Sequence, residues 1–147
     1  MDKAGFLTRF FAWVIDNVMV LMFSMLIGLV FGVILGITGG LDNSLANLIT
    51  TTMTLLLVFL LMAFQFIYFG FYWSKNSQSL GMMLMGIKVL RRDGSTLSFL
   101  RAGLRGTLGY YLSSLFFGLG YLWALLDKNG QTWHDKIFDT WVVRLRY

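Results

Sequence analysis

Four charged side chains have the types and spacing to form a charge network inside a membrane. Arg9 and Asp16 stand at the start of one long uncharged run, and Asp127 and Asp135 follow another. Seven positions are close to two helical turns, so Arg9 and Asp16 share a helix face and are predicted to form an ion pair. Ionisable residues at membrane depth commonly mark ion or proton pathways. The alternative is that both side chains reach the headgroups and only fix the depth of the helix.

Three further polar side chains are candidates to support this network. Asn17 and Gln65 stand in apolar runs and are expected to hydrogen-bond across helix interfaces. His134 is the only histidine, and the chain has no cysteine, which argues against a zinc site. No Ser/His/acid spacing indicates a hydrolase. We therefore expect no catalytic residue, no metal and no cofactor; an enzyme acting on lipid would have to use Asp127, His134 and Asp135.

Two of the acids also have local interpretations. Asp127 ends an apolar run, where a carboxylate opposes the helix dipole unless a cation pairs with it. The candidate cations are Arg9, Arg101 and Arg105. Asp135 follows Thr132 at the spacing of a capping box, which predicts a short helix starting there.

The composition is that of a membrane protein. Hydrophobic residues make up 57% of the chain and charged residues 13%, against about 25% charged in typical soluble domains. Three charge-free runs, over residues 17–41, 43–74 and 106–126, have the length that crossing a bilayer requires. We expect a single domain over residues 1–147.

The order of apolar, glycine and turn residues predicts an all-α membrane fold. Two transmembrane helices are expected, the first over residues 6–36 and the second capped by Asn43 or Ser44. The third apolar run is predicted to form a bent, re-entrant or spanning helix, since Gly118 and Gly120 stand where it can turn back.

A small cytoplasmic β-element is predicted beside the helices. Residues 87–97 have the pattern of a hairpin around the turn Asp93-Gly94, and the alternating residues 141–146 can supply a further strand. Ser79 is predicted to cap a short helix that precedes the hairpin.

Basic residues gather between the second and third apolar runs. By the positive-inside rule this segment and the N-terminus are expected to lie in the cytoplasm, which fits a multi-pass membrane protein. We expect the basic residues to contact anionic lipid headgroups. Nucleic-acid binding is not expected, because aromatic residues do not alternate with the basic ones. The basic residues are Lys75, Lys88, Arg91, Arg92, Arg101 and Arg105.

The first helix carries a stripe of small residues. Gly28, Gly32 and Gly36 recur at four-residue intervals, and Asn17 lies about three turns before them. Such a stripe lets another helix approach closely. We expect it to pack against the second helix, with a homodimer seam or another membrane protein as the alternative partner.

Several segments together resemble the RDD family of small bacterial membrane proteins, and the match spans nearly the whole chain. The family is named for one Arg and two Asp. Arg9 and Asp16 match the first two, and the second Asp is Asp127 or Asp135, of which we prefer Asp135. Leu80 and Met82 stand where the family often has Pro and a basic residue. The segments are Ala4-Gly5-Phe6-Leu7-Thr8-Arg9, Trp73-Ser74-Lys75 to Gly81, Gly86-Ile87-Lys88-Val89, Leu125-Leu126-Asp127 and Gln131-Thr132-Trp133-His134-Asp135.

The resemblance implies membrane residence and a shared fold, with a molecular function that is largely unassigned. Two functions fit the residues. In the first, the pair of Arg9 and Asp16 carries protons or ions across the membrane. In the second, the protein is a structural or regulatory membrane subunit that docks a partner or a second copy through its glycine stripe.

Overall fold

The computed structural model describes residues 2–39 and 44–145 of the chain. These residues form two compact units, and each is described by itself. The larger unit contains Met1–Asn17 and Gln65–Tyr147, and the helical unit contains Val18–Phe64. Helix α1 (Phe6–Gly39) and helix α2 (Ser44–Lys75) each contribute to both units.

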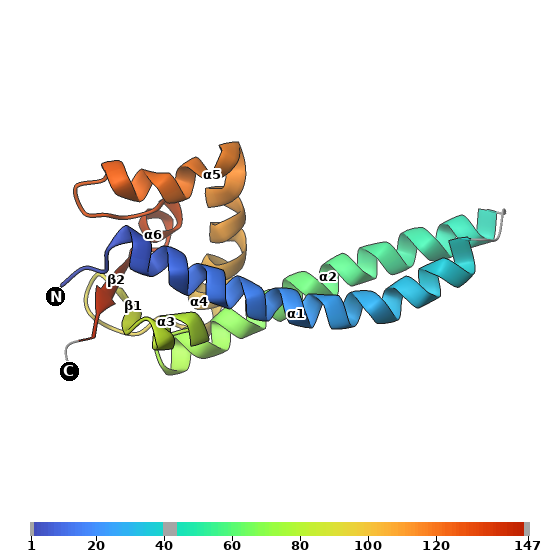
Figure 1. Cartoon of the computed structure of the whole chain (residues 1–147), viewed down its shortest axis with the longest axis horizontal. Coiled ribbons are helices and arrows are strands. Elements are labelled where there is room, and N and C mark those ends of the chain that lie inside the picture. Colours follow the sequence, from blue (N-terminus) through green and yellow to red (C-terminus); the bar gives the residue numbers. More distant parts are fainter. Residues whose placement is uncertain (1, 40–43, 146–147) are drawn as a thin grey trace. The chain divides into compact units, whose positions relative to one another are not determined.

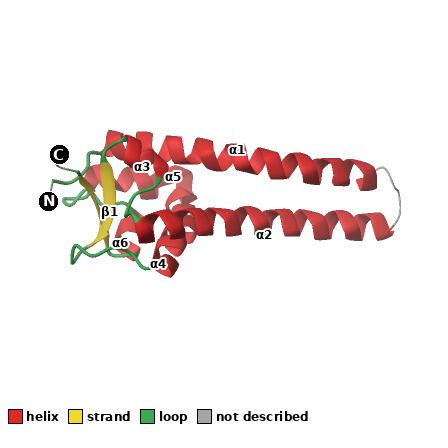
Figure 2. Cartoon of the chain, turned by 90° about the horizontal axis from the view of Figure 1, so that it is seen from below, coloured by secondary structure: helices red, strands yellow, loops and turns green. Residues whose placement is uncertain are grey.

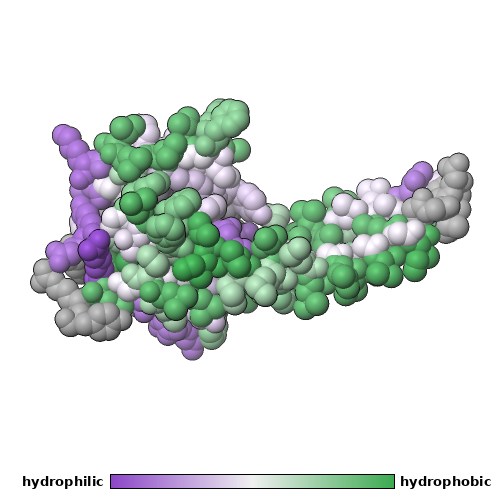
Figure 3. Space-filling model, viewed as in Figure 1, coloured by the Kyte–Doolittle hydropathy of each residue, from purple (hydrophilic) through white to green (hydrophobic). Residues whose placement is uncertain are grey.

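Three helical stretches are long and apolar enough to cross a membrane, as the composition predicts: Phe6–Ile37, Ser44–Lys75 and Phe99–Leu126. In the helical unit, α1 and α2 run side by side (Figures 1 and 2), and the ring of Phe23 stacks on that of Phe64. Hydrophobic side chains cover most of the visible surface of this unit (Figure 3), as expected for helices that face lipid.

The predicted boundaries of the first two helices hold to within a few residues. Helix α1 starts at Phe6 as predicted and continues to Gly39, beyond the predicted end at residue 36. Helix α2 starts at Ser44, one of the two predicted caps, and the other, Asn43, lies outside the described residues.

The larger unit contains a two-stranded antiparallel sheet. Strand β1 (Ile87–Arg91) pairs with strand β2 (Thr140–Arg144), with Val89 opposite Val142. The N-terminal segment lies along the other edge of β2, where the N–H of Ala4 donates to the carbonyl of Val142 at 2.9 Å. The short helix α3 (Leu80–Leu84) precedes β1.

The small sheet is confirmed, but its strands pair differently from the predicted hairpin. Ser95 and the two residues after it form no strand. The carboxylate of Asp93 accepts hydrogen bonds from the N–H and the hydroxyl of Ser95, which closes a local turn. Strand β1 therefore pairs directly with the C-terminal strand, which covers residues 140–144 instead of 141–146; Arg146 lies outside the described residues.

The third apolar run is bent, as predicted. Helix α4 (Phe99–Leu104) continues through a π-helical turn, η1 (Arg105–Gly109), into helix α5 (Tyr110–Leu126). Inside α5 the backbone leaves the helical conformation from Leu115 to Gly118. The two arms of α5 are visible in Figure 1.

The two arms of α5 pack closely because one contact position is a glycine. A Cβ at Gly120 would lie 2.5 Å from the Cα of Ser113, too close for any side chain. Phe116 and Phe117 adopt left-handed φ values of 53° and 58° at the bend, a conformation that non-glycine residues adopt at a cost in free energy. The strained turn bends the chain, and the glycine lets the two arms meet beside the bend.

Candidate functional site

A buried carboxylate, Asp135, joins three parts of the larger unit. It lies in the short helix α6 (Trp133–Ile137), whose start is the predicted capping box: the N–H of Asp135 donates to the Thr132 hydroxyl, and the Thr132 N–H donates to the Asp135 carboxylate. Nη2 of Arg105 donates to Oδ1 of Asp135 at 2.5 Å, and Nη1 of Arg9 donates to Oδ2 at 3.3 Å. We call Arg9, Arg105 and Asp135 the Asp135 cluster.

The Asp135 cluster is held in place by the surrounding backbone and side chains. Arg9, in the first turns of α1, also donates to the carbonyls of Gly130 (2.7 Å) and Val142 (3.3 Å). Nε of Arg105 donates to the Thr140 hydroxyl at 3.0 Å. The Arg105 guanidinium also lies over the ring of Trp73, 4.5 Å from its centroid. The cluster therefore connects α1, η1, α6 and β2.

The charges in the cluster keep Asp135 ionised. Burial by itself would raise the pKa of the Asp135 carboxyl, but the positive charges of Arg105 and Arg9 outweigh it, so the pKa lies below its ordinary value. Both Arg105 and Asp135 are only 1% exposed. Two guanidinium groups thus face one carboxylate, which leaves a net positive charge at this position.

Asp16 lies in a second, separate environment of neutral hydrogen-bond donors. Its side chain is 1% exposed. The hydroxyls of Tyr68 (2.8 Å) and Ser79 (2.5 Å) and the N–H of Gly81 (2.8 Å) all donate to its carboxylate. Helix α3 approaches α1 closely here, because a Cβ at Gly81 would lie 2.1 Å from the carbonyl oxygen of Ala12.

The predicted ion pair between Arg9 and Asp16 is therefore wrong. Arg9 pairs with Asp135, and within the described part of the chain no Lys or Arg lies within 4.0 Å of the Asp16 carboxylate. The physical reason is distance: residues seven apart share a helix face but stand about 10 Å apart along the axis, whereas pairs at three or four residues are neighbours. Arg9 therefore pairs with Asp135 at the start of α1, and Asp16 accepts hydrogen bonds from Tyr68, Ser79 and Gly81 two turns later.

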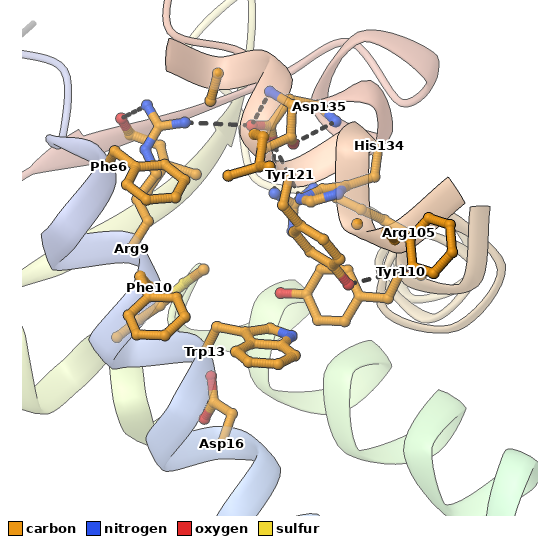
Figure 4. A pocket seen from close by; sticks show the side chains of 17 residues that line it. Phe6, Arg9, Phe10, Trp13, Asp16, Arg105, Tyr110, Tyr121, His134 and Asp135 are labelled. Atoms are coloured by element: carbon orange, nitrogen blue, oxygen red, sulfur yellow. Dashed lines mark hydrogen bonds and ion pairs between the residues drawn. The ribbon is translucent and has the colours of Figure 1, made fainter. Parts of the chain in front are cut away.

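A cavity of about 250 Å³ in the larger unit is lined by both acids. In Figure 4, aromatic rings surround the open space, with Asp16 at one end and Arg9 and Asp135 at the other. No three acidic, histidine or cysteine side chains of residues 2–39 and 44–145 converge as metal ligands. The rings belong to Phe6, Phe10, Trp13, Tyr110 and Tyr121.

His134 contacts both the cavity and a buried serine. Its Nδ1 lies 2.8 Å from the hydroxyl oxygen of Ser113, and its backbone N–H donates to the same oxygen at 3.3 Å. Burial lowers the pKa of His134 to about 3, so the ring is neutral at neutral pH. The 3.9 Å contact of its Nε2 with Asp135 is therefore not an ion pair. His134 supports the packing around the cluster as a neutral side chain.

Two other predictions of pairing need correction, and one is confirmed. Asp127 pairs with Lys136 at 2.6 Å instead of with an arginine, so it lies apart from the Asp135 cluster. The hydrogen bond from Lys136 lowers the pKa of the Asp127 carboxyl.

Asn17 donates to the Trp13 carbonyl of its own helix at 2.7 Å, so its predicted hydrogen bond across a helix interface is wrong. The predicted hydrogen bond of Gln65 across a helix interface is confirmed, because its Nε2 donates to the Gly106 carbonyl in the π-helical turn at 2.9 Å.

The basic segment is only partly available to headgroups. Arg105 is buried in the Asp135 cluster, so its assignment to the lipid-facing patch is wrong. Lys75 and Arg92 are exposed, and the rest are partly exposed. The partly exposed residues are Lys88, Arg91 and Arg101.

The glycine stripe of α1 does not pack as expected. A Cβ added at Gly28, Gly32 or Gly36 would meet nothing within 4 Å. The expected close approach of α2 at these positions is therefore wrong, and the stripe faces open space in the described structure.

The sequence as a whole matches the RDD family over residues 3–139, which is nearly its full length. The chain belongs to the RDD family. No curated protein and no solved structure matches it significantly. Family membership and the long apolar helices identify a membrane protein.

The two candidates for the second family aspartate have different partners in this RDD protein. Arg9 contacts Asp135 directly, whereas Asp127 pairs with Lys136 of α6. Asp16, the match for the first family aspartate, accepts its hydrogen bonds from Tyr68, Ser79 and Gly81 instead.

Sequence reasoning missed the partners of the RDD acids. Ser79 was expected to cap α3, but its side chain makes no cap hydrogen bond and donates to Asp16 instead. Tyr68 and Gly81 gave no signal, because their contacts with Asp16 join segments more than fifty residues apart. A basic segment predicts exposed side chains, and nothing in the sequence distinguishes Arg105 as the buried member of that segment.

Proposed function

We propose that this RDD protein moves protons or small cations across the membrane and that Asp16 is the group that binds them. The observation that carries the proposal is the environment of Asp16: a buried carboxylate, without a basic partner in the described residues, at the side of a cavity. Buried ionisable residues in transmembrane segments commonly serve in such pathways.

Asp16 suits reversible binding better than Asp135 does. Protonation of Asp135 would leave two buried guanidinium groups facing a neutral acid, which is unfavourable. The donors to Asp16 include two hydroxyls, of Tyr68 and Ser79, and a hydroxyl can either donate or accept a hydrogen bond. A protonated Asp16 can therefore donate to a hydroxyl oxygen without leaving a buried cation unpaired.

Proton flux in proteoliposomes tests the proposal. The purified chain is reconstituted with a pH-sensitive dye inside the vesicles, and a pH gradient is applied with and without Na⁺ or K⁺ outside. Asp16→Asn should reduce the flux to that of protein-free vesicles, because asparagine binds no proton. The matched control, Asp127→Asn, removes a carboxylate that does not line the cavity and should keep the flux of the unmodified chain. Equal flux for Asp16→Asn and the unmodified chain contradicts the proposal.

We further propose that Arg92 and the sheet face the cytoplasm of a bacterial inner membrane, with the start of α2 on the opposite side. The exposed basic residues of this segment support this orientation through the positive-inside rule and would contact anionic headgroups. The chain has no cysteine, so single cysteines at Arg92 and Ser44 can be labelled in intact cells. Labelling of Arg92→Cys from outside would reverse the assignment.

We propose no enzymatic activity for the protein. The contact between Ser113 and His134 resembles part of a catalytic triad, but Ser113 is fully buried between the two arms of α5. A nucleophile needs access to its substrate, together with a base in hydrogen-bond contact with an orienting acid. The 3.9 Å separation of His134 and Asp135 does not supply that contact.

A second candidate function is that of a subunit that docks another membrane helix. The specific observation is that Gly28, Gly32 and Gly36 face open space instead of α2. If a second copy covers this stripe, Gly32→Leu should convert a dimer into a monomer on size-exclusion chromatography with light scattering in detergent. Gly5→Leu, at a glycine outside the stripe, serves as the control. An unchanged mass for Gly32→Leu would exclude the stripe as the dimer seam.

A further inference from the structure

We propose that the aromatic cavity of the larger unit binds an anionic amphiphile, with a carboxylate or phosphate head at Arg9 and an apolar chain among the rings. The inference goes beyond the proposed transport and does not depend on it. Three observations carry it: an excess of positive charge at one end of the cavity, an apolar wall, and lining residues that are shared with the outer apolar surface.

The charge at the head end favours an anion. Arg9 and Arg105 face the single carboxylate of Asp135, and His134 is neutral. The protein does not fill all their donor positions, because Nε of Arg9 and Nη1 of Arg105 have no hydrogen-bond partner, but both of these atoms are buried. The side chain of Arg9 is 13% exposed, against 1% for its two neighbours in the cluster. Arg9 is therefore the charge of this cluster that an anionic group inside the cavity can reach.

The walls of the cavity fit an apolar chain. Phe6, Phe10, Trp13 and Tyr121 surround the space in Figure 4. A small cavity with mostly aromatic walls and a few converging polar groups has the usual features of a ligand site. The aromatic rings offer a chain the same burial from water that lipid does, and the guanidinium adds a specific contact that lipid lacks.

The cavity is partly open, and three of its lining residues also belong to the outer apolar surface. The exposed fractions of these side chains are 45% for Phe10, 104% for Phe117 and 45% for Leu122. An amphiphile dissolved in the bilayer would meet these side chains first. The entrance therefore lies where apolar chains gather.

Asp16, at the opposite end of the cavity from Arg9, does not change the preference of the cavity for an anionic head. Asp16 stands about 10 Å from Arg9 along α1, by helix geometry. Its carboxylate is 1% exposed and already accepts three hydrogen bonds from neutral donors. A cationic amphiphile would place its head against Arg9 or would have to displace these donors.

Quenching of Trp13 fluorescence tests the proposal directly, because this ring lines the cavity. The protein in phosphatidylcholine nanodiscs is titrated with ω-bromoundecanoate, whose bromine quenches tryptophan on contact. The signal from the cavity is the part of the quenching that disappears in Trp13→Phe, which corrects for the other tryptophans of the chain. The cationic probe is a bromoalkyl trimethylammonium ion of equal length.

We expect saturable quenching of Trp13 by the carboxylate and only weak, non-saturating quenching by the cation. Arg9→Gln should weaken carboxylate binding about tenfold or more, the loss of a charge-assisted hydrogen bond. Arg92→Gln, at an exposed arginine, is the control and should bind normally. Leu122→Phe narrows the cavity without touching the Asp135 cluster and should also reduce saturable quenching, so the test does not depend on the folding of Arg9→Gln.

The source of the anion is resolved by repeating the titration in phosphatidylglycerol nanodiscs. Loss of quenching there means that the lipid headgroup itself occupies the site, and unchanged quenching means that the site prefers a free single-chain carboxylate. Equal saturable quenching by the cationic probe would overturn the proposal. Unchanged binding in both Arg9→Gln and Leu122→Phe would also overturn it.

Discussion

Asp135→Asn is expected to destabilise the fold by about 3–5 kcal/mol, the range observed when one partner of a buried ion pair is removed. The carboxylate accepts hydrogen bonds at both oxygens, from Arg105 and Thr140 at Oδ1 and from Arg9 and the N–H of Thr132 at Oδ2. In either orientation of its amide, an asparagine places its NH₂ group, itself a donor, against the donors that face Oδ1 or against those that face Oδ2. The substitution therefore leaves two buried guanidinium groups with poor partners.

Chemical denaturation in detergent micelles measures this effect. Asp127→Asn is the matched control, because it removes the same charge from a pair whose Lys136 is 43% exposed, although Asp127 itself is only 11% exposed, and should cost less. A similar loss for both variants would contradict the central place of Asp135 in the fold.

The same cluster gives stability a defined pH dependence. The pKa of Asp135 is lowered in the folded state, so its contribution is present above the unfolded pKa of about 3.9 and is lost as the pH falls towards the folded value. The midpoint of denaturation should therefore fall with decreasing pH below about pH 4 in the unmodified chain. Asp135→Asn should show a weaker fall over that range.

The helical part of the fold could be predicted because a bilayer restricts the choices. Long uncharged apolar runs must satisfy their backbone within the segment, so they form helices. The bend of the third run followed from Gly118 and Gly120, and the structure places a close backbone contact at Gly120. The long helices and the bend depend on composition and on local conformational preferences, both of which can be read from the sequence.

Pairings between distant segments could not be predicted in the same way. The turn at Asp93 suggested a hairpin, but Ser95 satisfies that turn locally, and β1 pairs instead with a strand some fifty residues later. The spacing of Arg9 and Asp16 identified two functional candidates but not their partners. Those partners come from α2, from the start of α3 and from α6, whose positions depend on tertiary packing.

The second large effect concerns proton binding at Asp16. Two of the described carboxylates line the cavity. Asp135 remains charged between Arg9 and Arg105, whereas Asp16 has only neutral hydrogen-bond donors among the described residues. If Asp16 binds the transported proton, a neutral carboxylic acid must exist in the buried site for part of the cycle. Removal of that acid should abolish proton binding while leaving the Asp135 cluster, and hence the fold, intact.

Infrared difference spectroscopy between alkaline and acidic buffers, recorded on the protein in nanodiscs, detects this acid directly. The account predicts a carboxylic C=O band that shifts in D₂O, is missing in Asp16→Asn and persists in Asp127→Asn. A band that remains unchanged in Asp16→Asn would show that the proton resides elsewhere and would contradict the assigned role of this carboxylate.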